Sequence, residues 1–164
     1  MHMSKAATTI QNGRGYVITN FATIEMMMSQ VIARNYSGTK EKEQALLSDV
    51  LYHQYFSFEL KRSLFEKILK YNNPEQLKSP HSRKLRKMQE IRNMAAHAII
   101  RVKLGEDRDD INSIVFDFRG KEHQANKILE KYDELRASVE PLIRELSANK
   151  VTKKTELGEW LNNA

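Results

Sequence analysis

The stretch VKLGEDRDDINSIVFDF, residues 102–118, interrupts a sequence whose other segments have a helical pattern. In its last part, Ile114, Phe116 and Phe118 alternate with other side chains, and this period of two is typical of a half-buried strand. The polar loop GEDRDD, at 105–110, separates that part from the short apolar run VKL. We therefore expect two short strands that form a β-hairpin.

On both sides of the hairpin, apolar residues recur every three to four positions, which predicts amphipathic helices. Four helices are expected before it, at about 16–36, 43–51, 58–71 and 83–101. One long helix is expected after it, at about 122–148, bent or divided at Pro141. The predicted fold class is mainly α: an antiparallel bundle of four to five helices, with a short β-hairpin (about 102–118) before the last long helix.

Length and composition fit one globular domain, since the chain has 164 residues, of which 40% are hydrophobic and 29% charged. We expect a flexible N-terminal tail at 1–15, a helical domain at 16–148 and a C-terminal tail at 149–164. No apolar run reaches the roughly 18 residues of a membrane helix, and no secretory signal is recognisable, so no membrane partner is expected. The absence of cysteine excludes disulfides and thiolate-bound metals, and it fits the cytoplasm.

The positive charge is concentrated in one segment. Between Lys78 and Lys103 there are eight basic residues and one acid, Glu90, so this segment carries +7 while the whole chain carries +6. Clustered cations favour a polyanionic partner, because each neutralised phosphate releases counterions. The simpler alternative is a solvated helix face.

The fourth expected helix contains EIRNMAAHAII, residues 90–100, with an arginine, an asparagine and a histidine among small apolar residues. Successive helical residues are rotated by about 100°, so Asn93 and His97 share a side, whereas Arg92 lies about 140° away from His97. Arg92 falls at the edge of the apolar arc. Either a long arginine wraps partway around the helix, or a second copy of the helix supplies the missing residue across a two-fold axis.

The side of this helix opposite the core is not uniformly polar, because Ala96 and Ile100 flank Asn93. Small residues permit close helix approach, and an outward isoleucine suits a partner surface. A symmetric dimer is the commonest way to bury such a surface. The alternative is a solvent-facing histidine with an incidental isoleucine beside it.

Glu25 falls inside the apolar arc of the first expected helix. A carboxylate there is costly unless it is paired or hydrogen-bonded. Arg92 is a suitable partner, and so are several tyrosine hydroxyls. Glu25 is therefore a supporting residue that orients Arg92, or a residue with a direct catalytic role. No motif with metal-ligand spacing and no phosphate-binding glycine loop is present, so neither a metal nor a cofactor is expected.

The segment RNMAAH, residues 92–97, resembles the R-x4-H form of the R-x(4–6)-H signature of HEPN domains, including the polar residue after the arginine. The context is similar to prokaryotic members of that family. An amphipathic helix (FATIEMMMSQVIARNY) and an aromatic-then-basic helix start (FSFELKRSLFEKIL) precede the motif, and a hairpin and a closing helix follow it. The resemblance covers roughly 16–148, and only the motif is sharp.

The resemblance implies a helical domain that dimerises through the motif helices. Many members are metal-independent endoribonucleases that act as toxins, phage-defence effectors or RNA-processing enzymes. It implies Arg92 and His97 as the catalytic pair and Asn93 as an auxiliary polar residue. Toxin members are often paired with a nucleotidyltransferase-like antitoxin, which is a possible partner here. Some relatives lack activity and bind nucleotides or serve as scaffolds.

The residue types suit RNA cleavage by the 2′-hydroxyl. Such cleavage needs a base, an acid and positive charge on the phosphate, and a histidine with an ordinary pKa near 6.5 suits the proton transfers. Arginine supplies a forked cation for the phosphate. Flanking phosphates would be held by the basic run Arg83, Lys84, Arg86 and Lys87. The alternatives are a non-catalytic helical dimer that binds a nucleotide or a partner protein, and a basic RNA-binding module that does not depend on His97.

Overall fold

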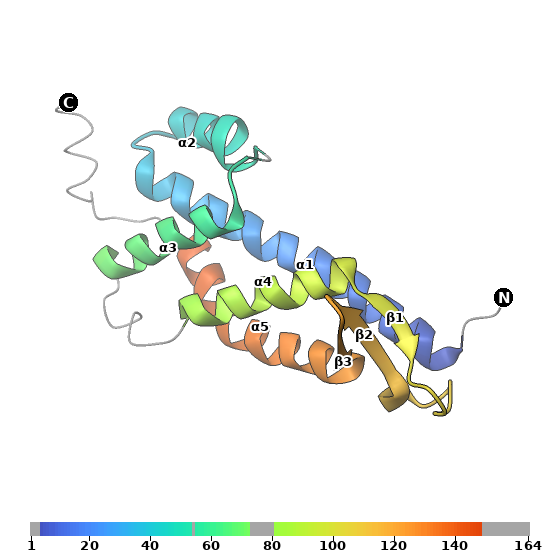
Figure 1. Ribbon diagram of the computed structural model, residues 1–164. Coiled ribbons are helices and arrows are strands. Elements are labelled where there is room, and N and C mark those ends of the chain that lie inside the picture. Colours follow the sequence, from blue (N-terminus) through green and yellow to red (C-terminus); the bar gives the residue numbers. More distant parts are fainter. Residues whose placement is uncertain (1–3, 54, 73–80, 149–164) are drawn as a thin grey trace. The chain divides into compact units, whose positions relative to one another are not determined.

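The computed structural model describes residues 4–53, 55–72 and 81–148 (Figure 1). It is mostly helical (76%), and its described part contains five α-helices and a small three-stranded antiparallel sheet before the last long helix. The predicted fold class is thus confirmed. The expected C-terminal tail, 149–164, lies outside the described residues. Contacts group the chain into two compact units: a first unit made of the residues up to Ala22 with Arg86–Ser138, and a second made of Thr23–Leu85 with the residues from Val139.

The elements have the following bounds. The helices are α1 (Lys5–Tyr36), α2 (Lys40–Leu46), which continues as the π-helix η1 (Leu47–Leu51), α3 (Phe58–Asn72), α4 (His81–His97) and α5 (Ala125–Ala148). The strands are β1 (Ile99–Val102), β2 (Ile114–Phe118) and β3 (Lys121–Gln124), and a short 3-10 helix, η3 (Ile111–Ser113), precedes β2.

Helix α1 begins at Lys5, so the expectation of a flexible tail at 1–15 is wrong for the described residues from 5 onward. The hydroxyl of Ser4 accepts a hydrogen bond from the backbone N–H of Ala7, as a helix N-cap does. Ala6 and Ile10 are buried one turn apart and belong to the core of the first unit. Burial of this sparse apolar stripe stabilises a segment whose two glycines weaken its helical propensity.

The two glycines of α1 provide a matched test of packing in the first unit. A Cβ at Gly15 would meet nothing within 4 Å, whereas one at Gly13 would lie 2.5 Å from Cδ1 of Leu129 on α5. Gly15→Ala is expected to raise the free energy of unfolding by roughly 0.5–1 kcal/mol, because alanine loses less backbone entropy in a helix. Gly13→Ala should gain less, since Leu129 must move. Chemical denaturation checks both, and equal gains would contradict the close approach.

The sheet has the order β1-β2-β3, with both pairs antiparallel (Figure 1). Strand β1 pairs Ile99 with Asp117, so it begins three residues earlier than the hairpin predicted at about 102–118. Strand β3 was not predicted, because its sequence KEHQ has no apolar alternation and the last helix was expected to begin at about 122. Arg119 and Gly120 both have positive φ, 54° and 73°, as a two-residue hairpin turn requires.

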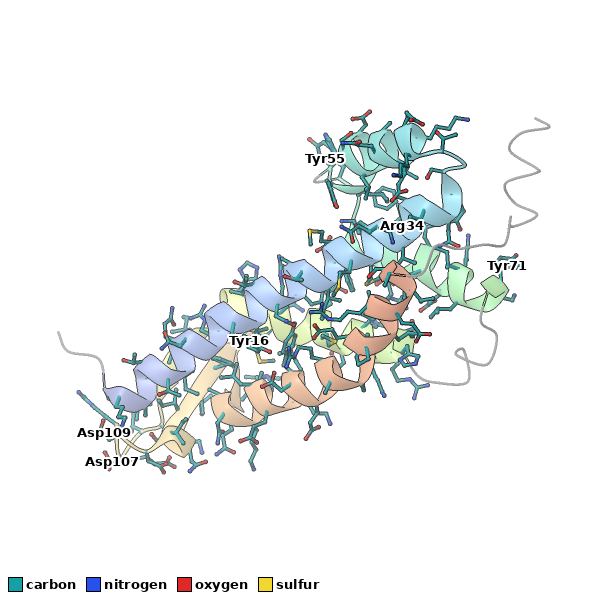
Figure 2. All side chains as sticks on the ribbon, turned by 180° about the vertical axis from the view of Figure 1, so that it is seen from behind. Tyr16, Arg34, Tyr55, Tyr71, Asp107 and Asp109 are labelled. Carbon is teal, nitrogen blue, oxygen red and sulfur yellow. The ribbon has the colours of Figure 1, made fainter. Side chains whose placement is uncertain are left out.

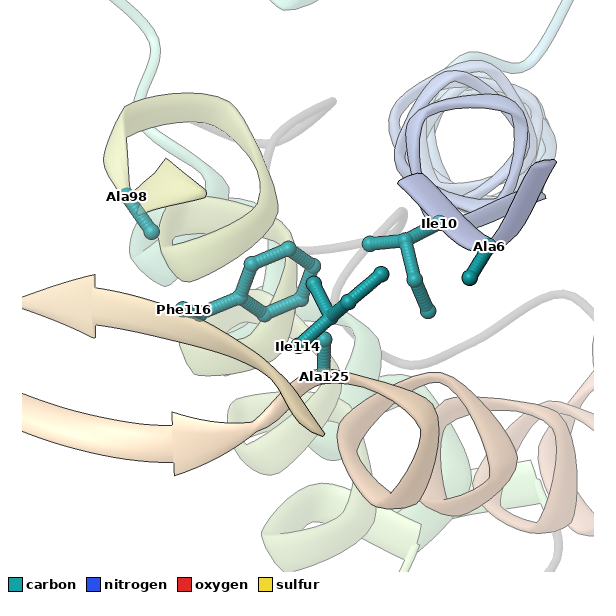
Figure 3. Packing of buried hydrophobic residues seen from close by; sticks show 6 residues of the cluster. All are labelled: Ala6, Ile10, Ala98, Ile114, Phe116 and Ala125. Carbon is teal, nitrogen blue, oxygen red and sulfur yellow. The ribbon is translucent and has the colours of Figure 1, made fainter. Parts of the chain in front are cut away.

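The core of the first unit lies between the sheet and two helices. Figure 3 shows Ile114 and Phe116 of β2 next to Ile10 of α1 and Ala125 of α5. All four side chains are fully buried. Helix α5 is continuous across Pro141, so of the two outcomes expected there, a bend or a division, the division does not occur.

The second unit has its own buried apolar side chains. Those from α1, η1 and α3 include Ile24, Met28, Ile32, Leu51, Phe65 and Leu69. Helix α2 starts with an N-cap, because the hydroxyl of Thr39 accepts from the N–H of Lys42 at 3.3 Å. This unit is therefore built around apolar contacts and a capped short helix.

Helix α4 begins at His81, a residue whose side chain is buried and whose Nδ1 has no hydrogen-bond partner among the described residues. Burial lowers the pKa of His81 below its ordinary value of 6.5, and the charge of Lys84 lowers it further. The folded protein thus holds this imidazole in its neutral form more strongly than the unfolded chain does.

The lowered pKa of His81 predicts a pH dependence of stability. The unfolded chain binds a proton at His81 below about pH 6.5, whereas the folded protein binds it only at a lower pH. The free energy of unfolding should therefore be fully retained above that pH and should fall as the pH drops from 7 to 5. His81→Gln should make this fall smaller, as measured by urea denaturation at each pH. Identical slopes in both proteins would contradict the prediction.

Candidate functional site

The motif occupies the last two turns of α4, which ends at His97. The apolar arc predicted for this helix is confirmed within α4, because Met88, Ile91 and Ala95 are buried. Ile99 continues the spacing of that face in the sequence but is 59% exposed. The chain is already a strand at that residue, so helical rotation no longer determines where its side chain lies.

Arg92 is half-buried and held from two sides. Its Nη1 donates a hydrogen bond to Oδ1 of Asn93 at 3.0 Å. Its guanidinium carbon lies 6.0 Å from the centre of the ring of Phe21, a buried residue of α1, within the range of a cation–π contact. Asn93 and Phe21 thus fix the direction of the arginine side chain.

His97 is exposed at the end of α4. Within 4–53, 55–72 and 81–148, no hydrogen bond or ion pair involves its imidazole, and none joins it to Arg92. A hydrogen bond thus joins Arg92 to Asn93. Among the described residues nothing joins Arg92 to His97, as expected from the rotation of about 140° between these two positions. An imidazole in this environment is accessible to a substrate.

Arg14 is a neighbour of the motif that the sequence did not reveal. Its Nε donates to the carbonyl oxygen of Ala95 at 2.6 Å, and its Nη2 donates to that of Ala96 at 3.3 Å. Its Nη1 reaches Oε1 of Gln11 at 3.5 Å. No signal in the sequence could have identified Arg14, because the contact spans 81 residues and the segment was expected to be a flexible tail.

The outer face predicted around Asn93 requires a correction. Ile100 lies in β1 and packs against the core of the first unit, so it does not flank Asn93 on an outward helix face. The reason is that α4 ends at His97, four residues before the predicted end. The exposed isoleucine beside His97 is Ile99, and Ala96 is half-buried.

Glu25 has a partner other than those considered from the sequence. Its Oε1 lies 2.6 Å from Nζ of Lys61 on α3, a partner that was not expected from the sequence. The Lys61 side chain is only 6% exposed, whereas that of Glu25 is 28% exposed. Glu25 therefore compensates a buried ammonium group within the second unit.

The basic run is mostly accessible. Arg83, Arg86 and Lys87 are exposed, and Lys84 is half-buried. Arg86 and Lys87 share the carboxylate of Glu90, at 3.9 Å and 2.9 Å. Exposed ion pairs of this kind contribute little to stability, so both cations remain available to a phosphate.

The rest of the described chain offers no metal site as an alternative to the motif. Within the ranges given above, no three histidine or acidic side chains converge as a metal site. The acidic loop between β1 and β2 carries Asp107 and Asp109, which point outward (Figure 2). A cavity of about 870 Å³ in the second unit is lined by Arg34, Thr39, Lys40, Tyr52 and others, and it includes no motif residue.

None of the helices in the described ranges combines the length and the hydropathy that a bilayer-spanning helix needs. Comparison with protein-family models, curated proteins and solved structures finds no match for this chain. The chemistry of Arg92, Asn93 and His97 and the charge around them are therefore the basis for any functional proposal.

Proposed function

We propose that this protein is a metal-independent endoribonuclease of HEPN type, the toxin or phage-defence effector of a two-gene system. The observation that carries the proposal is the contrast within the motif of α4. Arg92 is half-buried and fixed by Asn93 and Phe21, whereas His97 is exposed and unengaged among the described residues. A fixed cation suits the charge that develops on the phosphate, and an accessible imidazole suits the proton transfers of RNA cleavage.

In the proposed reaction, one His97 imidazole removes the proton from the 2′-hydroxyl, whose oxygen attacks the adjacent phosphorus. The bond from phosphorus to the 5′-oxygen breaks, and a second, protonated imidazole donates a proton to that oxygen. The products are a 2′,3′-cyclic phosphate and a 5′-hydroxyl. Arg92 offsets the charge that develops on the phosphate. Asn93 contributes by orienting Arg92 through their 3.0 Å hydrogen bond.

A homodimer supports this chemistry, because one chain has one such histidine and does not bring it to Arg92. A two-fold axis near the ends of two α4 helices would place two histidines and two arginines in one cleft. Ile99, exposed beside His97, is an apolar residue that such a contact would bury. The basic run Arg83, Lys84, Arg86 and Lys87 would then bind phosphates of RNA outside the cleft.

The dimer can be tested by mixing two inactive variants. Arg92→Ala retains its histidine and His97→Ala retains its arginine, so a mixed dimer has one of each in the shared cleft. Only partial recovery of RNA cleavage on mixing is expected, because the cleft then has one imidazole where the proposed reaction uses two, and water must replace one proton transfer. Light scattering that shows a monomer at high protein concentration would contradict the shared site, and so would mixed variants that remain as inactive as each alone.

The function itself is tested by incubating the protein with single-stranded RNA in EDTA. Cleavage that continues in EDTA is expected. If the protein is instead a non-catalytic dimer, it should bind a nucleotide or a partner protein without cleavage. If it is only a basic RNA-binding module, its affinity should depend steeply on salt and on Lys84, Arg86 and Lys87, and not on His97. A nucleotidyltransferase-like protein encoded by a neighbouring gene would support the toxin role.

A further inference from the structure

The C-terminal end of α4, where His97 lies, is unfavourable for an anion unless the negative charge of the helix end is offset. The last carbonyl groups of a helix have no partner inside the helix, and they form its negative end. Here the carbonyl of Met94 accepts from the N–H of Ala98 at 2.8 Å. A phosphate beside His97 would face the next two carbonyls, those of Ala95 and Ala96.

Those two carbonyls are the ones that Arg14 binds. Its guanidinium donates through two different nitrogens, at 2.6 Å and 3.3 Å, which is a forked contact that lysine cannot reproduce. Arg14 is half-buried, so its charge is less screened by solvent than that of an exposed arginine. The negative end of α4 is therefore both hydrogen-bonded and electrostatically offset next to His97.

Helix α1, which carries Arg14, also contacts Arg92, the other catalytic residue of the motif. Phe21, which lies under the guanidinium of Arg92, is seven residues after Arg14 and thus two turns along the same face of α1. One face of α1 supports Arg92 at one point and the terminal turn that carries His97 at another. Both contacts lie within the first unit.

We infer that Arg14 is a positioning residue of the candidate site: it fixes the last turn of α4 under His97 and permits a phosphate to approach that turn. Its catalytic consequence rests on the proposed ribonuclease function, whereas its effect on phosphate binding does not. The residue itself has its donors directed at backbone carbonyls and Gln11, so it acts through α4 and not on the reacting atoms.

The test compares Arg14→Gln, which removes the charge, with Arg14→Lys, which keeps the charge but loses the fork. Arg34→Gln is a matched control, because Arg34 also lies on α1 (Figure 2). Arg34 belongs to the second unit and donates to the carbonyl of Ser147 near the end of α5. Single-turnover RNA cleavage in EDTA gives the first readout. The second is the shift of the His97 ring resonances on titration with a 2′-O-methyl RNA hexamer, which binds but cannot react.

Arg14→Gln is expected to slow cleavage roughly tenfold or more, the effect of losing hydrogen bonds from a charged group. It should also weaken the response of the His97 ring to the hexamer. Arg14→Lys should fall between Arg14→Gln and the wild type in both readouts, and Arg34→Gln should match the wild type. Intermediate values for Arg14→Lys would exclude the explanation that substitution at Arg14 only prevents folding. Circular dichroism checks the fold of each variant.

Two results would overturn the inference: wild-type behaviour of Arg14→Gln in both readouts, or an equal loss in Arg34→Gln. A wild-type protein that does not cleave RNA would instead refute the proposed function. The hexamer titration would then decide the role of Arg14 alone, since an unchanged response of His97 in Arg14→Gln would refute that role and a weakened response would support it.

Discussion

His97→Ala is expected to lower the rate of RNA cleavage by about 10²–10⁴-fold, the usual contribution of a general acid or base. Arg92→Ala should also lower the rate of RNA cleavage, because it removes the cation that offsets charge on the phosphate. Single-turnover cleavage of RNA in EDTA measures both effects. The imidazole of His97 is exposed and makes no hydrogen bond within the described residues, so its removal should leave the fold intact.

His53→Ala is a matched control for these variants. His53 is also exposed, but it lies in the loop before α3 and stacks on Tyr55 with ring centres 5.0 Å apart. This variant should cleave RNA at the wild-type rate. Full activity in His97→Ala or Arg92→Ala, with the fold intact by circular dichroism, would refute their assigned roles.

The largest effect on stability is expected from the ion pair of Glu25 with Lys61. Glu25→Leu should lower the free energy of unfolding by about 3 kcal/mol, at the low end of the range for breaking a buried pair, because Glu25 keeps some exposure. The reason is that the variant leaves the Lys61 ammonium buried without a counter-charge. Guanidinium or urea denaturation at neutral pH measures the change.

Two further variants separate this explanation from a general effect of substitution. Glu25→Leu combined with Lys61→Met should recover most of the lost stability, because the second change removes the buried charge. Glu134→Ala, which breaks an exposed pair with Lys131, should change stability by less than about 1 kcal/mol. A loss in Glu25→Leu as small as that in Glu134→Ala would contradict the burial of Lys61.

Apolar periodicity predicted the helices, but it did not show where α4 ends, because the same apolar spacing continues into the strand that follows. Ile91, Ala95 and Ala98 continue a helical stripe, and Ile99 fits the same stripe, so the sequence pattern has no visible end at His97. The break arises from pairing of Ile99 with Asp117, a contact between segments far apart in the sequence. Strand β3 could not be predicted for a different reason: it pairs with its neighbour β2, but its polar residues show no apolar alternation of their own.

The candidate site was predictable only where it depends on one helix. Arg92, Asn93 and His97 share α4, and their divergence follows from helical rotation. The oddity of Glu25 was visible in its own helix, but its partner was not, because several side chains have the chemistry to pair with it. Arg14 could not be predicted, since its hydrogen bonds to α4 exist only once α1 is packed against it.

The chemical ends of RNA cleaved in EDTA test the central claim most directly. Attack by the 2′-hydroxyl with proton transfer by His97 predicts a 2′,3′-cyclic phosphate on one product and a 5′-hydroxyl on the other. A substrate with 2′-deoxyribose at the cleaved position should remain intact. Products with a 5′-phosphate, cleavage of the deoxy-substituted substrate, or activity that EDTA abolishes would contradict the proposed reaction.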